Sequence, residues 1–389
     1  MVSMRLPTVR IPGTVFGSAL RKQKILKGLN DFPSCYRISC ISLAGLVNMK
    51  VAILAPICWR TPPLHYGPWE QVASNIAEGL VERGLDVTLF ATGDSLTRGH
   101  LEYICEHPYE EDKTLDPKAW ECLHIAHVME RAEGYDIIHN NYDFFPLTYS
   151  RLIRTPMVTT IHGFSSPKII PVYKEYNDTN YYVSISNADR NPELHYVATV
   201  YNGIKVEEFT YHEAIGDFLL YFGRIHHDKG TFEAIQIAKK FGMKLIISGI
   251  IQDQKYYEEK VKPYLNDDDV VFIGHSGPKR RNTLFGRAYA LLHPINFAEP
   301  FGLSVAESML CGTPVVAFNK GAMPELIVQG KSGFIVDTVD EAVEALKGIK
   351  SINRQFCRCW AEDNFSQEKM VADYIAVYKK ILNRHITPI

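Results

Sequence analysis

The sequence lacks the features that would assign it at once to a nucleic-acid-binding, membrane-spanning or zinc-binding class. Its 389 residues carry a formal net charge of −2, whereas a dedicated nucleic-acid-binding protein presents a strong basic excess. No segment offers the roughly 18 uncharged apolar residues of a membrane-spanning helix. Eight cysteines are scattered without a C-x-x-C pair, which favours reduced thiols in a cytosolic protein. We therefore expect a cytoplasmic protein without a nucleic-acid partner or a transmembrane segment, and leave a peripheral membrane contact open.

Acidic residues are nearly absent from residues 1–48, where Asp31 alone faces a series of lysines and arginines. Basic, acid-poor segments of this kind occur in targeting arms. The alternative that we favour is an upstream extension, disordered or not native, ahead of a natural start at Met49. We exclude it from the fold prediction.

From Met49 onward, short apolar strands alternate with amphipathic helices, the pattern of parallel sheets with helical crossovers. The expected strands of the first half are 50–56, 86–92, 135–140, 156–163, 181–186 and 195–203, and its helices are 68–84, 117–133 and 146–153. The pattern restarts with strands 217–225, 243–250, 269–276, 289–296 and 313–319, and helices 230–242, 254–265, 279–288, 302–312 and 366–384. We predict two doubly wound, Rossmann-like α/β domains, 49–203 and 204–365, that face a cleft, followed by a C-terminal helix in 366–389.

The stretch "EPFGLSVAE" places one carboxylate before a helix and another inside it. Pro300 fits only the first turn of a helix, so the helix is expected to begin near Phe301 and Gly302, with Glu299 in the preceding loop. The free amides at such a helix start form an anion site, and glycine leaves room for a phosphate. Glu307, over a turn deeper, can accept two hydrogen bonds from a ribose diol. By spacing alone, a helix cap and a solvated face is the favoured explanation of the two glutamates.

Two cations precede this stretch in "YFGRIHHDKG". Arg224 follows a strand and Lys229 precedes a helix, so both can reach a diphosphate and offset charge on a leaving group. Either residue alone is more often a surface cation. Their position in the same half as the glutamates favours a functional role.

In combination these motifs resemble glycosyltransferase family 4, the retaining, nucleotide-sugar-dependent enzymes of the GT-B fold. The family signature, two glutamates separated by seven residues, matches "EPFGLSVAE", and "FGRI...KG" and "GTPVVAF" also match. The stretch "YGPWEQVASNIAEGLVERGLDVTLFATGDS" resembles the family's first strand–loop–helix unit. The similarity extends over residues 49–385 and implies that the C-terminal helix crosses back to the first domain.

The resemblance implies a role for each matched residue. Glu299 would hold hydroxyls of the donor sugar and Glu307 the ribose, while Arg224 and Lys229 would bind the diphosphate. His162, in "TTIHGF", would contact the donor sugar near the reacting carbon, although a core histidine is an equal alternative by residue type. The remaining donor-binding positions are Gly67, Phe301, Gly302 and Leu303.

Two residues depart from the family pattern, and two segments imitate metal sites. Pro68 replaces the usual second glycine, and His227 replaces a proline, so the geometry of both loops is in doubt. Residues 267–269 spell the Asp-x-Asp of metal-dependent transferases of a different fold, but they lie between a helix and a strand and are expected to be a solvated loop. The residues "HHD" at 226–228 could ligate a metal and are expected to be polar loop groups. We therefore predict no metal site and no cofactor.

At the end of a strand in the first half, Asn140, Asn141 and Tyr142 suit sugar hydroxyls and are expected on the acceptor side, with turn formation as an equal alternative. The sequence therefore predicts a retaining, metal-independent hexosyltransferase with a UDP-, GDP- or ADP-sugar donor and a carbohydrate, lipid-linked or small-molecule acceptor. The alternatives are a nucleotide-sugar epimerase or phosphorylase of the same fold, or a non-catalytic nucleotide-sugar-binding subunit.

Overall fold

The computed structural model describes residues 49–64, 67–164, 166–266 and 268–386, all within one compact unit. The expected extension at residues 1–48 lies outside the described residues. Within the described part, no helix combines the length and apolarity that crossing a membrane requires.

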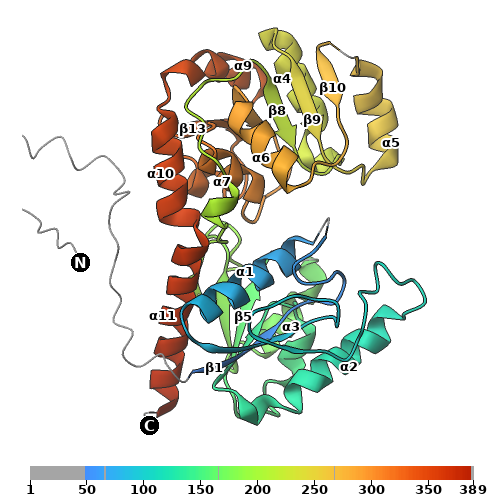
Figure 1. Ribbon diagram of the computed structural model, residues 1–389, viewed down its shortest axis with the longest axis vertical. Helices are drawn as coiled ribbons and strands as arrows, with labels where there is room; N and C mark the ends of the chain where they lie inside the picture. The colour runs from blue at the N-terminus through green and yellow to red at the C-terminus, as the bar shows by residue number, and fades with distance from the viewer. Residues whose placement is uncertain (1–48, 65–66, 165, 267, 387–389) are drawn as a thin grey trace, which may run out of the picture. The chain divides into compact units, whose positions relative to one another are not determined.

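The first half of the chain forms a seven-stranded parallel sheet with the order β3-β2-β1-β4-β5-β6-β7 (Figure 1). Its strands are β1 (Lys50–Leu54), β2 (Asp86–Phe90), β3 (His100–Glu102), β4 (Ile137–Asn140), β5 (Met157–Ile161), β6 (Asn180–Ser184) and β7 (Tyr196–Thr199). Its α-helices are α1 (Pro68–Glu82), α2 (Pro117–Met129) and α3 (Ile170–Glu175). The sheet confirms the predicted doubly wound first half.

Alternate side chains of this sheet enter two separate cores. In β1, Val51 and Ile53 pack in the core beneath α1, whereas Ala52 and Leu54 pack in the core that α2 and α3 cover. Successive strand residues point to opposite faces, so a strand buried on both faces is apolar throughout, as "VAIL" is.

The second half forms a six-stranded parallel sheet with the order β10-β9-β8-β11-β12-β13. Its strands are β8 (Leu219–Phe222), β9 (Leu245–Ser248), β10 (Val270–Phe272), β11 (Ala290–His293), β12 (Val315–Phe318) and β13 (Gly333–Val336). Its helices are α4 (Thr231–Phe241), α5 (Gln254–Tyr256), α6 (Pro278–Arg287), α7 (Leu303–Leu310), α8 (Met323–Leu326), α9 (Val339–Lys347) and α10 (Arg354–Phe365). This strand order, 3-2-1-4-5-6 within the sheet, is that of a dinucleotide-binding fold.

The last helix, α11 (Gln367–Ile386), returns to the first sheet. Met370, Val371, Tyr374 and Tyr378 lie in the core beneath α1, and α1 and α11 run side by side in Figure 1. The predicted crossing of the C-terminal helix is confirmed.

Several elements differ from the sequence expectations. The helix expected at 146–153 is a 3-10 turn, Phe145–Tyr149, and the helix expected at 254–265 breaks into α5, a π-turn and a 3-10 turn. The sequence patterns did not predict β3, α3, α8, β13, α9 and α10. Five of the described cysteines are free thiols.

Candidate functional site

The reversal of strand order between β8 and β11 marks where a sheet of this kind binds ligands, outside the carboxyl ends of its strands. The loop after β8 carries Arg224 and Lys229, and the loop after β11 carries Glu299. Three of the residues predicted from the sequence therefore follow the two strands that flank this point.

Lys229 and Glu299 are in direct contact. The Lys229 Nζ lies 2.5 Å from the Glu299 Oε2, and only 15% and 12% of the two side chains are exposed. The Lys229 ammonium also lies 4.5 Å from the centre of the Phe297 ring, within cation–π distance. The free protein therefore holds the cation and the carboxylate as a nearly buried pair.

Gly230 explains how Lys229 comes so close to the loop after β11. Its φ of 70° is left-handed, and a Cβ at this position would lie 1.8 Å from the carbonyl oxygen of Pro294. Only glycine fits both requirements, because any side chain would push the two loops apart.

Helix α7 begins at Leu303, one residue after the expected start, with Gly302 as its N-cap at a φ of 98°. The amides of Val305 and Ala306 donate to the carbonyl oxygen of Gly302, whereas those of Leu303 and Ser304 have no backbone partner among the described residues and are available to an anion. Phe301 is buried against Tyr201 and Phe365, so its ring anchors the loop while its backbone lies at the helix start. Residues with a side chain rarely adopt the φ of 98° found at Gly302, so this turn favours glycine.

Glu307 is buried in α7, where its Oε1 accepts a hydrogen bond from the Arg281 Nη1 at 3.1 Å. Burial raises the pKa of Glu307, and Arg281 opposes that shift. Arg281 also lies 3.8 Å from the Glu208 Oε2 and over the ring of Phe209. No sequence pattern singled out Arg281. It holds the Oε1 of Glu307, and no other described residue bonds to the Oε2, which is left for a ligand.

Arg224 donates a hydrogen bond from its Nη1 to the side chain of Gln252, which follows β9. Arg224 contacts neither Glu299 nor Glu307. It shares with them only its location at the carboxyl edge of the second sheet.

His162 lies at the carboxyl end of β5 in the first sheet. Its Nε2 lies 3.0 Å from the Asn141 Oδ1, and the ring of Trp69 stacks on it with centroids 5.7 Å apart. Burial lowers the pKa of His162 to about 3, so the ring is neutral. Since the Oδ1 of Asn141 can only accept, the His162 Nε2 carries the proton and its Nδ1 keeps a lone pair.

Gly67 is the N-cap of α1 with a φ of 155°, and Pro68 is the first residue of that helix. A Cβ on Gly67 would lie 2.9 Å from the Oε2 of Glu70, a buried carboxyl whose pKa burial raises to about 7. Gly67 therefore allows close packing of the chain at this helix start, and its role towards a phosphate stays a prediction.

Most polar groups of the predicted acceptor-side residues, in the loop after β4, already have partners within the protein. Asn140 accepts from the amide of Tyr142 and donates to the carbonyl oxygen of Asp143. Tyr142 is 6% exposed, and its hydrogen bond with Glu121 adds to the burial that raises its pKa. This geometry favours the turn-forming alternative at both residues, whereas Asn141 contacts His162. Their role towards an acceptor stays a prediction.

The carboxyl ends of the two sheets are connected by specific contacts. A Cβ on Gly163, after β5, would lie 2.9 Å from the Cγ of Pro300, beside Glu299. Glu325 in α8 accepts hydrogen bonds from the amides of Asn187 and Ala188, after β6, at 2.8 and 2.7 Å. These contacts bring the loops of His162 and Glu299 towards each other.

The two segments that imitate metal sites occupy different places. Asp268 and Asp269 directly precede β10, so they lie at the amino edge of the second sheet, opposite Glu299, and Asp267 is outside the described residues. His226, His227 and Asp228 cluster in the loop after β8. Both ring nitrogens of His227 face carboxylates, with Nε2 at 3.1 Å from the Asp228 Oδ1 and Nδ1 at 3.3 Å from the Asp253 Oδ2.

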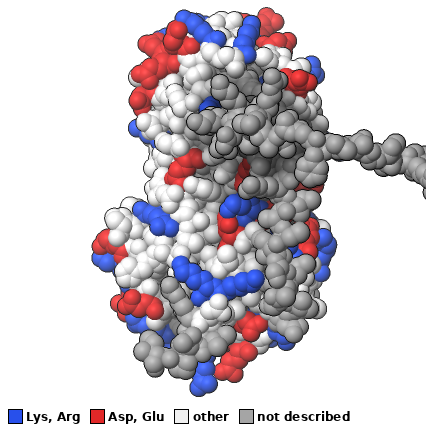
Figure 2. Space-filling view, turned by 90° about the vertical axis from the view of Figure 1, so that its left-hand side faces the viewer, with Lys and Arg blue, Asp and Glu red and all other residues white. Residues whose placement is uncertain are grey.

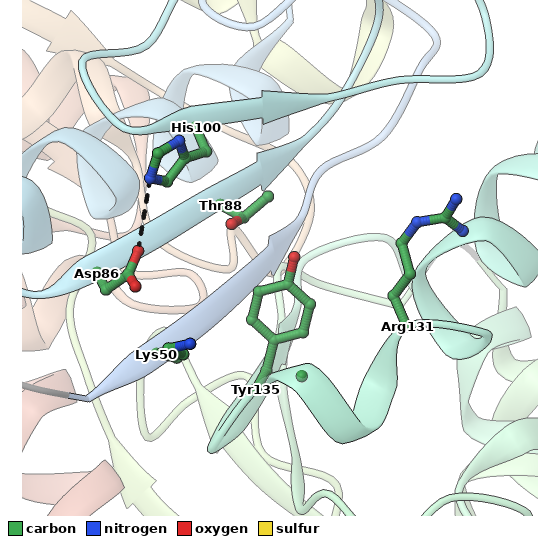
Figure 3. Close-up of a pocket in the computed structure, with 7 residues that line it drawn as sticks. Lys50, Asp86, Thr88, His100, Arg131 and Tyr135 are labelled. Carbon is green, nitrogen blue, oxygen red and sulfur yellow. Dashed lines mark ion pairs between the residues drawn. The ribbon is translucent and has the colours of Figure 1, made fainter.

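A surface pocket lies away from all these residues (Figure 3). It is lined by Lys50, Asp86 and His100, the first residues of β1, β2 and β3, so it is at the amino edge of the first sheet. Acidic and basic side chains are interspersed among the described residues of the face in Figure 2, and neither sign forms a continuous field there.

Buried histidines predict how stability depends on pH. Desolvation lowers four histidine pKa values, to about 4 at His124 and His293 and to about 3 at His139 and His162. Below about pH 6.5 these histidines bind protons in the unfolded chain but stay neutral in the folded protein. Their contribution to the free energy of unfolding therefore falls as pH falls. Burial has the opposite effect on three carboxyls, with pKa values raised to about 7 at Glu70 and Asp189 and also raised at Glu307.

The four histidines outnumber the three carboxyls by one proton, so the free energy of unfolding should fall by at most about 1.4 kcal/mol per pH unit between about pH 6 and 4.5. Urea unfolding at pH 6.5 and 5.0 measures the change. A denaturation midpoint that rises on acidification would show that the raised carboxyls outweigh the histidines and would contradict this prediction.

Two family models match the chain, "Glycosyl transferases group 1" over residues 213–359 and "Glycosyltransferase Family 4" over residues 69–208. An uncharacterised glycosyltransferase of Methanocaldococcus jannaschii is 25% identical over 345 residues, which cover 74% of this chain and 85% of the relative. The glycogen synthase of Mycobacterium tuberculosis is 24% identical over 335 residues, covering 71% and 80%. Among solved structures, Anabaena HepE in complex with UDP and glucose superimposes with a TM-score of 0.65 at 20% identity, covering 85% of this chain and all of HepE.

Proposed function

Because the chain belongs to the group 1 (family 4) glycosyltransferases of the GT-B fold, we propose that it transfers a hexosyl group from a nucleoside diphosphate sugar to a hydroxyl acceptor with retention of configuration. The observation that carries the proposal is the nearly buried Lys229–Glu299 pair beside the start of α7, where the strand order of the second sheet reverses. A cation, a carboxylate and free helix amides at one place fit a diphosphate joined to a sugar. The solved complexes of HepE with UDP and glucose and with UDP-glucose support this class of donor.

Each proposed role follows from the position of the residue. Glu307, held by Arg281, accepts from the ribose diol through its free oxygen. Lys229, Arg224 and the first amides of α7 bind the diphosphate, and Glu299 receives hydroxyls of the sugar. The lone pair on the His162 Nδ1 accepts from a sugar hydroxyl, while Asn141 and Trp69 hold the ring.

A donor panel tests the function. Calorimetry with UDP, GDP and ADP should show one preferred nucleotide, and Glu307→Ala should weaken its binding by about 1.5–3 kcal/mol, the value of hydrogen bonds to a charged group. Glu344→Ala, which removes an exposed carboxylate of α9, is the control. Unchanged affinity of Glu307→Ala for the nucleotide would remove Glu307 from the site. If the protein binds the nucleotide but releases no nucleoside diphosphate from the nucleotide sugar, it is a binding subunit and not a transferase.

We expect turnover to continue in EDTA, because side chains and helix amides offset the charge of the departing diphosphate. Changing Asp267, Asp268 and Asp269 to Asn should leave the rate within a few-fold of wild type. The control is the same assay after manganese or magnesium is added back. Activity that disappears in EDTA and returns with either ion would make the reaction metal-dependent and contradict this part of the proposal.

A further inference from the structure

We propose that His293 is a positioning residue that holds the Glu299 carboxylate when Lys229 moves to the donor diphosphate. The inference rests on the proposed function for the ligand that attracts Lys229. Its structural basis, a histidine facing an ion pair, is present in the free protein.

His293 is the last residue of β11 and is 6% exposed. Among the described residues its Nε2 has no hydrogen-bond partner, and it lies 3.8 Å from the Glu299 Oε2. That oxygen is the one bound by the Lys229 Nζ at 2.5 Å. An unpartnered buried nitrogen therefore faces a carboxylate oxygen just beyond hydrogen-bonding distance.

Packing alone does not explain a histidine at this position. A buried polar nitrogen without a partner destabilises the folded state, and the neighbouring strand positions Ala290, Leu291 and Leu292 are all apolar. A leucine would fill the end of β11 without that cost. The cost is removed if the Nε2 gains a partner in another state of the site.

The charge state of His293 suits this role. Desolvation lowers its pKa to about 4, with Glu299 opposing and Lys229 adding to the shift. The neutral ring carries one N–H and adds no third charge to the pair. When Lys229 turns to the diphosphate, Glu299 loses its cation, and a sub-ångström movement brings the His293 Nε2–H into bonding distance of the carboxylate.

A double-mutant cycle tests the contact without any substrate. Lys229→Met leaves His293 as the donor nearest to Glu299, so His293→Leu should destabilise the Lys229→Met protein about tenfold more, in folding equilibrium constant, than it destabilises wild type. In the control cycle His124→Leu replaces His293→Leu, because His124 is also buried with an unpartnered ring nitrogen but bonds to Ala55 in the first sheet. That cycle should be additive.

Additive losses for the pair His293 and Lys229, within a factor of two, would overturn the proposal. If His293→Leu does not fold, His293→Asn replaces it in the cycle, because an asparagine amide reaches the place of Nδ1 and not that of Nε2. The cycle yields its answer even if wild type transfers no sugar, in which case only the proposed function fails.

Kinetics tests the role in the donor complex. His293→Leu and His293→Asn should lower kcat about tenfold or more with little change in KM for the donor, and His293→Gln should restore kcat to within about threefold of wild type, because the glutamine amide nitrogen reaches the place of Nε2. An equal loss of kcat in all three variants, or an effect on KM alone, would show that His293 has only a packing role.

Discussion

Replacing Lys229 by alanine should lower kcat by about 10²–10³-fold, the loss that follows removal of one preorganised contact to charge that develops in the transition state. Lys229 is positioned by Gly230, which lets its loop approach Pro294, and by its contact with Glu299. A nearly buried ammonium stabilises a departing diphosphate more than a solvated one does, since the lower dielectric strengthens the interaction. Arg224→Ala should lower kcat in the same direction.

Steady-state kinetics with the preferred donor measures this effect. Lys240→Ala is the matched control, because Lys240 lies on α4 and forms an exposed pair with Asp340. The melting temperature of each variant must be recorded, since removing Lys229 also leaves Glu299 without its cation. A rise in KM with kcat intact would show uniform binding of donor and transition state, and would contradict the role proposed for Lys229.

Residues that follow strand ends were the most predictable part of the site. Arg224 and His162 follow predicted strand ends, Lys229 and Glu299 precede predicted helix starts, and all four match motifs of the family that the sequence resembles. The contact between Lys229 and Glu299 depends on two loops meeting. Gly230 allows the two loops to approach each other, and no local sequence pattern predicts this approach.

Arg281 and His293 could not be identified by the same reasoning. Arg281 lies on the polar helix "PKRRNTLFGR", where nothing distinguishes it from its neighbours until α6 is placed beside α7. His293 ends an apolar strand and has the pattern of a core residue. Its significance appears only when its unpartnered Nε2 is found beside Glu299.

The sequence was least informative where stability comes from tertiary packing. β13 and α9 are short, and they are buried because β12 lies next to both and α4 packs against α9. Propensity in short segments is weak compared with such packing. The acceptor-side prediction at Asn140 and Tyr142 faced a related limit, because a turn and a sugar-binding loop draw on the same residue types.

The retention that we propose rests on the lack of an assigned general base behind the sugar. An inverting transferase needs a base behind the sugar to take the proton of the acceptor. In the proposed donor complex Glu299 receives hydroxyls of the sugar, and His162, which has a pKa of about 3, donates its Nε2 proton to Asn141. The leaving phosphate oxygen is then the group that takes the acceptor proton, on the face from which it departs, as in the front-face mechanism of the family that this chain resembles.

Proton NMR of the transfer product, recorded before mutarotation, tests this most directly. The wild-type protein is incubated with its preferred α-linked nucleotide sugar and a hydroxyl acceptor, and the anomeric coupling of the new glycoside is read. The same mixture with Lys229→Ala serves as the background. We predict the small coupling of an α-linked product. The large coupling of a β-linked product from an α-linked donor would contradict retention and the arrangement of Lys229, Glu299 and His162 on which it rests.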